Sequence, residues 1–130
     1  MTLEDLEMVS ATDCEDNETL NRITLIYRDH HMPKKVFLQK MQIVFHKHQE
    51  SNSIIMGDFN INMKDDNSLE TIACAKGFFP LVDCGTTIHD TVLDQIFINF
   101  PMPRNWKVVS LQSYFSDHNL VVLCMKKPTI

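Results

Sequence analysis

The chain has 130 residues, of which 44% are hydrophobic, and it carries a net charge of −5. That apolar content is enough for a hydrophobic core and argues against a disordered polypeptide. The acidic balance argues against a module that holds nucleic acid by charge alone, because such modules are basic. An acidic chain that handles phosphates needs a bound cation to offset its own carboxylates and the charge of the substrate.

Cysteine spacing and the absence of targeting patterns indicate the cellular environment. The four cysteines have no Cys-x-x-Cys spacing, so we expect reduced thiols and no zinc site. Residues 1–16 are acidic and lack the basic and apolar regions of a signal peptide. The apolar runs are too short to span a bilayer. We therefore expect a soluble intracellular protein of the nucleus or cytoplasm, with residues 1–130 in a single domain.

Hydrophobic periodicity and turn residues predict the elements along the chain. Residues 20–27 are β-branched and apolar, which favours a strand, and apolar residues recur at helical spacing over residues 34–49. Asn67 and Glu70 resemble a capping box, and Gly77 fits the position just past a helix end. The expected strands are 6–12, 20–27, 53–57, 79–82, 92–99, 107–113 and 120–125, and the expected helices are 34–49 and 69–76.

The order of these elements indicates the fold class. Two strands, a helix, a strand and a second helix come before four further strands, so the elements neither alternate strictly nor segregate. This order predicts an α/β sandwich with packed mixed or antiparallel sheets flanked by helices.

A carboxylate and an amide follow the predicted strand at 53–57. In an extended chain the side chains of Asp58 and Asn60 point to one side, while Phe59 points into the core. The carboxylate can accept a proton from water, and the amide can hydrogen-bond both that water and a phosphate oxygen. The alternative is an ordinary turn, because aspartate and asparagine are common after strands.

A second polar turn and a lone acid offer the remaining candidate groups. Asp117 and His118 lie between two apolar runs, where they could bind a cation and donate to a phosphate, or form an incidental turn. Asp94 lies within the apolar run 92–98, so it needs a partner such as His118 if it is buried, or it faces solvent. Tyr27 ends a strand, where its hydroxyl could contact a phosphate or simply lie in water.

Three short motifs carry the candidate residues, namely GDFN at 57–60, LDQIF at 93–97 and SDH at 116–118. In this order they resemble the endonuclease/exonuclease/phosphatase superfamily, whose members include deoxyribonuclease I. The local sequence is most similar in character to the endonuclease domain of LINE-type (non-LTR) retroelements. The phrases that carry this second resemblance are TLIYR at 24–28, IIMGDFNIN at 54–62, VLDQIFIN at 92–99 and SDHNLVV at 116–122.

The resemblance covers residues 6–125 and implies a role for each candidate catalytic residue. Asp58 would activate the attacking water, and Asn60 would orient that water and the phosphate. His118 would stabilise the pentacovalent phosphate, and Asp94 would hold His118 in position. The implied fold is deoxyribonuclease I-like, and the implied reaction is metal-dependent hydrolysis of a DNA phosphodiester.

The resemblance also implies a cofactor. Asp117 would assist Asp58 in binding Mg²⁺, or Mn²⁺ in its place. Tyr27 matches the tyrosine that lies at a strand end near the scissile phosphate. Family members also carry an asparagine and a glutamate in an earlier half of the domain, and no glutamate of this chain lies in the corresponding motif. Gln95 stands where the family more often has His or Tyr.

These departures imply a partial domain that lacks the N-terminal part of the family fold. We expect its DNA hydrolysis to be impaired, and we expect self-association through the surface that the absent part would cover. One alternative is an inositol or lipid phosphatase of the same superfamily, although the sequence has no cluster of basic residues that would bind a polyphosphate head group. The other is a non-catalytic remnant that acts only as a folding or interaction module.

Overall fold

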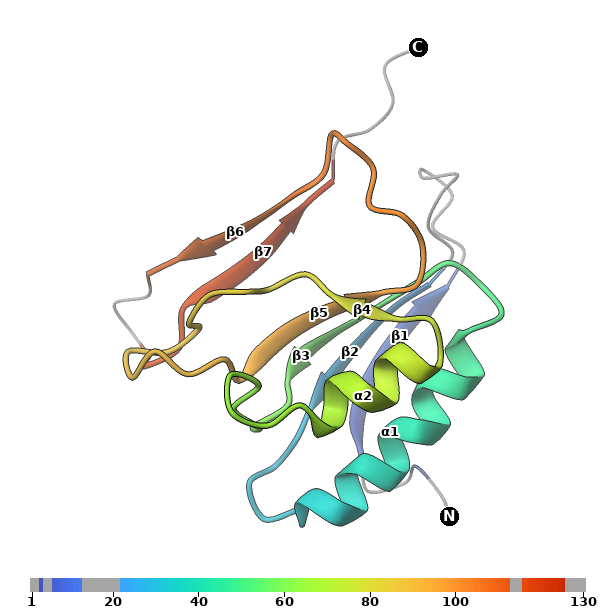
Figure 1. Ribbon diagram of the computed structural model, residues 1–130, viewed down its shortest axis with the longest axis horizontal. Helices are drawn as coiled ribbons and strands as arrows, with labels where there is room; N and C mark the ends of the chain where they lie inside the picture. The colour runs from blue at the N-terminus through green and yellow to red at the C-terminus, as the bar shows by residue number, and fades with distance from the viewer. Residues whose placement is uncertain (1–2, 4–5, 13–21, 113–115, 126–130) are drawn as a thin grey trace.

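The computed structural model describes residue 3 and residues 6–12, 22–112 and 116–125. The strands are β1 Glu7–Thr12, β2 Arg22–Tyr27, β3 Ser53–Asp58, β4 Phe79–Pro80, β5 Asp94–Ile98, β6 Lys107–Leu111 and β7 Leu120–Cys124. The helices are α1 Lys34–His48 and α2 Ser68–Ala75. Strands β1 to β5 form a mixed sheet in the order β1-β2-β3-β5-β4, and β6 and β7 form an antiparallel hairpin (Figure 1).

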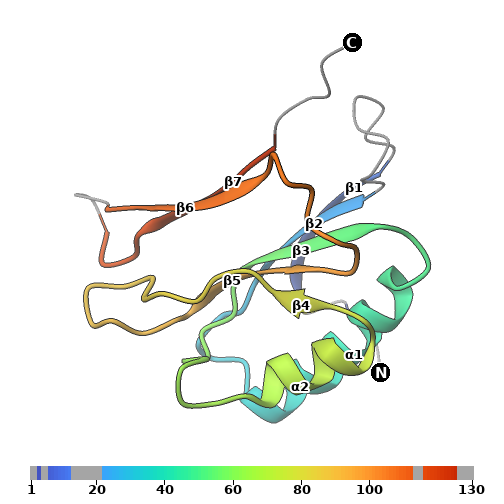
Figure 2. The same cartoon turned by 45° about the horizontal axis from the view of Figure 1, so that its top comes forward.

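The elements form three layers. Both helices lie against one face of the five-stranded sheet, and the β6–β7 hairpin lies on the opposite side (Figure 2). Side chains alternate between the two faces of a strand. Ile55 and Phe97 therefore join the core under the helices, whereas Ile54 and Ile96 join the core under the hairpin. This arrangement confirms the predicted α/β sandwich. Among the described residues, no helix has the length and apolar character needed to cross a membrane.

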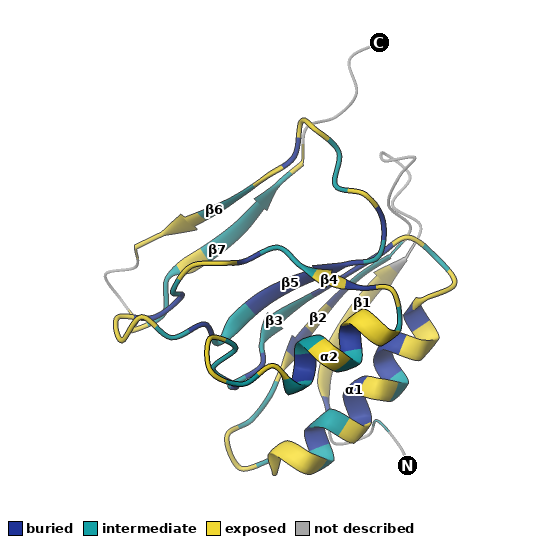
Figure 3. Ribbon diagram, in the orientation of Figure 1, coloured by how far each residue is buried: buried dark blue, intermediate teal, exposed yellow. Residues whose placement is uncertain are grey.

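Helix α1 packs as its periodicity predicts. Phe37, Met41, Val44 and Phe45 are fully buried against the sheet, and the outward side of the helix is exposed (Figure 3). The ring of Phe45 meets that of Phe97 edge-on, with the centroids 5.4 Å apart. Each such side chain stabilises the fold by about 1.5–3 kcal/mol on full burial. This packing fixes β3 and β5, the strands that carry Asp58 and Asp94.

The predicted and observed bounds differ by a few residues. Helix α2 begins one residue early, and the predicted capping box is wrong, because the Asn67 side chain makes no capping hydrogen bond. Instead, the Ser68 N–H donates to Asp66 Oδ1 at 2.9 Å. Parts of two expected strands, residues 20–21 and 113, lie outside the described residues.

The hairpin leaves part of the large sheet uncovered. Val9 on β1 lies opposite Leu25 on β2, and these side chains are 69% and 49% exposed. The apolar residues of the hairpin pack instead on Ile54, Ile96 and neighbours from β3 and β5. Val9 and Leu25 therefore form a pair of exposed apolar side chains on this face of β1 and β2.

Replacing both Val9 and Leu25 with threonine should reduce self-association and the binding of a hydrophobic dye. Threonine has the β-branched shape that suits a strand, and it presents less apolar surface than valine or leucine. Light scattering and dye fluorescence measure the two effects. Leu111→Thr is the matched control, since Leu111 is equally exposed at 49% but lies on β6. If the double variant scattered light and bound the dye as the wild type does, this face would cause neither self-association nor dye binding.

A buried histidine joins α1 to the sheet. His48, only 4% exposed, donates from Nδ1 to the Val44 carbonyl at 2.7 Å. In the neutral ring, Nε2 accepts from the Thr24 hydroxyl at 2.7 Å, and Thr24 in turn accepts from Ser10 at 2.8 Å. Burial lowers the pKa of His48, only partly opposed by the bond to Val44, and the charges of Arg22 and Lys47 lower it further.

This lowered pKa predicts that His48 makes the fold acid-sensitive. The unfolded chain binds a proton on His48 more readily than the folded chain does. The contribution of His48 to the free energy of unfolding is therefore complete above about pH 6.5 and is lost as the pH falls below that value. Urea unfolding at about pH 5.5 and about pH 7.5 should show a smaller acid-induced loss in His48→Gln than in the wild type. His46→Gln, an exposed site on the same helix, should keep the wild-type pH dependence.

Candidate active site

Three polar side chains occupy neighbouring positions at one end of the large sheet. Tyr27 on β2 lies opposite Asp58 on β3, and Asp58 lies opposite Asp94 on β5. Directly opposed side chains on neighbouring strands are close enough to interact, and two carboxylates in this relation repel each other. This end of the sheet therefore concentrates negative charge that needs a compensating group.

His118, from the segment that leads into β7, supplies that group. Its Nδ1 donates to Asp94 Oδ2 at 2.9 Å, which is the hydrogen bond expected for a lone acid in an apolar strand. Its Nε2 lies 3.7 Å from Asp58 Oδ2. The side chains of His118, Asp58 and Asp94 are 29%, 23% and 20% exposed, so Asp94 does not face open solvent. The imidazole thus stands between two half-buried carboxylates.

The pKa values of Asp58 and His118 are both shifted in this site. Burial raises the pKa of Asp58, and the negative charge of Asp94 raises it further, against the opposing effects of the Asn60 N–H and His118. Burial alone would lower the pKa of His118. The hydrogen bond and charge of Asp94, followed by the charges of Asp58 and Asp117, outweigh burial and raise that pKa. The site favours an imidazolium next to a carboxylate that can take up a proton.

Replacing Asp94 with asparagine should lower the pKa of His118, because the charge that supports the imidazolium is lost. NMR titration of the imidazole resonances measures the shift directly. In the wild type the raised pKa stabilises the fold below the unfolded pKa, and this contribution disappears as the pH rises through the folded value. Asp65→Asn, at an exposed position outside the site, should leave the titration of His118 unchanged. A wild-type titration in Asp94→Asn would refute the pairing.

Backbone pairing with residues 84–92 positions His118. Thr87 and His118 form an isolated antiparallel bridge, and the Asn119 N–H donates to the Thr86 carbonyl at 2.7 Å. Thr86 is fully buried, and its hydroxyl oxygen accepts the N–H groups of Leu93 and Asp94 at 3.0 and 3.3 Å. Thr86 therefore connects the segment carrying His118 to the strand carrying Asp94.

Arg28 holds the loop that follows Asp58. Its backbone N–H donates to the Asp58 carbonyl at 2.9 Å, and its Nη1 donates to the Asn60 carbonyl at 2.7 Å. The same guanidinium donates to the Met32 carbonyl from Nε and Nη2 at 3.2 and 2.9 Å. Sequence reasoning missed both Arg28 and Thr86. The only sequence signal for Arg28 was an arginine directly after the strand-end tyrosine.

The strand geometry assumed for Asn60 is wrong. β3 ends at Asp58, and Asn60 adopts a left-handed conformation with φ 53°. The Asn60 N–H donates to Asp58 Oδ1 at 3.0 Å. The two residues therefore form a turn in which the backbone of Asn60 orients the carboxylate of Asp58. Phe59 is fully buried, as expected.

Two other predicted residues lie at the edge of the site. Tyr27 is 43% exposed at the end of β2, in register with Asp58. Asp117 is exposed, and its carbonyl accepts the Ile88 N–H at 2.9 Å. Its charge still raises the pKa values of Asp58 and His118, so it contributes to the negative potential of the site.

The donor set of the site can accommodate a cation. Carboxylate oxygens of Asp58 and Asp94 and a ring nitrogen of His118 lie within 4.8 Å of one another. The two carboxylates can ligate an ion, whereas the protonated imidazole can only donate hydrogen bonds. A cleft of about 200 Å³ opens beside the two carboxylates. It is lined by Met56, Gly57, Asp58, Asp94, Gln95, Ile96, Asn119, Leu120 and Val121. Carboxylate oxygens suit Mg²⁺, and a divalent ion would relieve the repulsion that raises the pKa of Asp58.

Comparison with solved structures identifies the architecture. The endonuclease domain of TRAS1, a telomere-specific non-LTR retrotransposon, matches this chain with a TM-score of 0.65 and 20% sequence identity. The match covers 92% of this chain and 66% of that domain. The fold is deoxyribonuclease I-like. CdtB, the biologically active subunit of cytolethal distending toxin, matches with a TM-score of 0.55 and 14% identity, over 95% of this chain and 57% of CdtB.

The chain therefore spans less than two thirds of the length of either structure. No protein-family model and no curated protein sequence matches it. At these identities the likeness concerns the fold, and the chemistry of the site has to be argued from its own residues.

Proposed function

We propose that this deoxyribonuclease I-like chain hydrolyses DNA phosphodiester bonds in a reaction that depends on a divalent metal ion, as a retroelement-type endonuclease. The observation that carries the proposal is His118 held by Asp94 and facing Asp58 across 3.7 Å. A carboxylate that can accept a proton from water and an imidazolium that can donate to a phosphate oxygen, held together in one site, are the groups that the attack of water on a phosphate requires. The likeness to the TRAS1 endonuclease domain supports DNA as the substrate.

Each residue has a role in this proposal. Asp58 accepts a proton from the attacking water. His118, kept protonated by Asp94, donates from Nε2 to a phosphoryl oxygen as negative charge develops there. Asn60 orients the water and the phosphate, and Tyr27 contacts the phosphate from the neighbouring strand.

Mg²⁺, or Mn²⁺ in its place, is the proposed cofactor, with Asp58 and Asp117 as its ligands and Asp94 adding negative charge beside them. When bound, the ion would supply positive charge to the phosphate oxygens and to the leaving group. The acidic cluster alone repels a phosphate, since Asp58, Asp94 and Asp117 are offset by a single imidazolium. The proposal therefore requires that DNA binding and cleavage both depend on the ion.

Nicking of supercoiled plasmid tests this function. We expect slow nicking in Mg²⁺ that EDTA abolishes, because the match covers 66% of the TRAS1 endonuclease domain and no glutamate of this chain lies in the motif of the superfamily that it resembles. A plasmid assay suits a slow enzyme, since one cut relaxes a whole circle. Nicking that persists in EDTA, or no nicking above buffer after prolonged incubation at high protein concentration, would contradict the proposal.

A separate measurement tests the ion without relying on activity. Mn²⁺ is paramagnetic and should broaden the NMR signals of residues around Asp58 and His118, and excess Mg²⁺ should reverse the broadening. Asp58→Asn should weaken this effect, whereas Asp65→Asn should not. Uniform broadening over the acidic surface would indicate non-specific attraction and would contradict the proposed site.

A further inference from the structure

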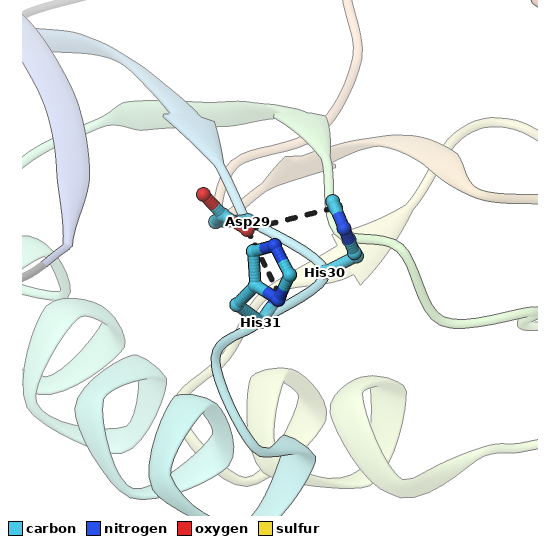
Figure 4. Close-up of side chains that lie close together, drawn as sticks. All are labelled: Asp29, His30 and His31. Atoms are coloured by element: carbon cyan, nitrogen blue, oxygen red, sulfur yellow. Dashed lines mark hydrogen bonds and ion pairs between the residues drawn. The ribbon is translucent and has the colours of Figure 1, made fainter.

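A second cluster of ligand side chains lies on the turn between β2 and α1. Asp29, His30 and His31 each offer one donor atom, and these atoms lie within 4.8 Å of one another (Figure 4). Both histidines are exposed, and the side chain of Asp29 is 47% exposed, so the cluster is open to ions from solvent. Asp29 Oδ1 already lies 3.6 Å from His30 Nδ1.

The turn that carries the cluster is held firmly by hydrogen bonds. The Met32 N–H donates to the Asp29 carbonyl at 3.0 Å and closes the turn. The His31 N–H donates to Asp29 Oδ1 at 2.8 Å and orients the carboxylate. The Arg28 guanidinium donates twice to the Met32 carbonyl. A backbone fixed at both ends lowers the entropy lost when side chains on it close around a ligand.

The donor chemistry selects the kind of ion. Two imidazole rings and one carboxylate suit zinc and other first-row transition metals, whereas Mg²⁺ prefers oxygen ligands. The rings of His30 and His31 lie 4.0 Å apart between centroids, with their planes tilted by 40°. Exposed side chains change rotamer on the nanosecond scale, so small rotations can bring the donors to about 2.0–2.2 Å from one ion.

We propose that Asp29, His30 and His31 form a binding site for one divalent transition-metal ion of the zinc type, separate from the Asp58–Asp94–His118 site. Water molecules complete its coordination, as expected for three protein ligands on an open surface. The turn is directly connected to the loop after β3, because Arg28 donates to the carbonyls of both Asp58 and Asn60. An ion bound there adds positive charge to an acidic chain, close to the loop that follows Asp58.

Titration with Zn²⁺ in the presence of excess Mg²⁺ tests this site, with the imidazole NMR signals as the readout. We expect saturable shifts of the His30 and His31 signals at one ion per chain, with little change at His118. His30→Ala and His31→Ala should each weaken Zn²⁺ binding, measured by calorimetry, by at least about tenfold. Asp29→Asn should weaken it as well.

Two control variants separate this site from other places where zinc could bind. His46→Ala removes an exposed histidine from α1 and should leave the affinity unchanged. His118→Ala should also leave the affinity of the turn unchanged, whether or not the chain cleaves DNA. Zinc binding that is lost in His118→Ala and kept in His30→Ala would overturn the proposal, and so would shifts that never saturate.

Discussion

Replacing His118 with alanine is expected to slow Mg²⁺-dependent plasmid nicking by about 10²–10³-fold, the usual cost of removing one donor to a developing oxyanion. The change removes the only imidazole that faces Asp58 within the described residues. It also leaves Asp58 and Asp94 opposite each other without their shared counter-charge, so the pKa of Asp58 should rise further. Initial rates of loss of the supercoiled form measure the effect.

The matched control is His46→Ala. His46 is exposed on α1, which lies on the other side of the large sheet from the hairpin (Figure 2). Its removal should leave the nicking rate unchanged. Circular dichroism should show that both variants are folded, since His118 is only partly buried. A His118→Ala protein that nicks at the wild-type rate would remove His118 from the mechanism.

Replacing Gly57 with alanine is expected to lower the free energy of unfolding by at least about 2 kcal/mol. Gly57 has a φ of 152°, a conformation that L-residues with a side chain rarely adopt. A methyl group at this position would also overlap the carbonyl oxygen of Ile26 on the neighbouring strand. Urea unfolding measures the loss. Because Asp58 is the next residue, the same change should also displace the proposed general base.

Gly77→Ala separates the two causes. Gly77, just past the end of α2, has a φ of 83°, but a methyl group there would meet no atom within 4 Å. Its replacement should therefore cost only the left-handed strain, about 1–2 kcal/mol. Equal losses in the two variants would show that the close approach of β2 to Gly57 contributes nothing.

The sequence predicts the elements well because most of them bury regular apolar patterns. The spacing of Phe37, Met41 and Val44 allows only one face of a helix to be buried, and α1 forms there. The pairing of Asp94 with His118 is also predictable, since an acid in an apolar strand needs a partner.

What the sequence cannot predict depends on backbone pairing between distant segments. The bond from the Asn119 N–H to the Thr86 carbonyl involves no side-chain pattern, and Thr86 reads as an ordinary loop residue. The left-handed turn at Asn60 likewise depends on Arg28, 32 positions earlier, holding its carbonyl. These contacts position the candidate site, and only the assembled fold reveals them.

The division of the site between two layers gives the protein an internal optical reporter. Asp58 and Asp94 belong to the large sheet, whereas His118 enters with the hairpin. The chain has a single tryptophan, Trp106, which is buried in the core between these layers with its ring edge-on to Phe100 at 5.7 Å. Any separation of the hairpin from the sheet would move His118 away from Asp58 and Asp94, and it would also expose the indole ring of Trp106 to water. The emission of Trp106 should therefore follow the assembly of the site in real time, without a label or a substrate.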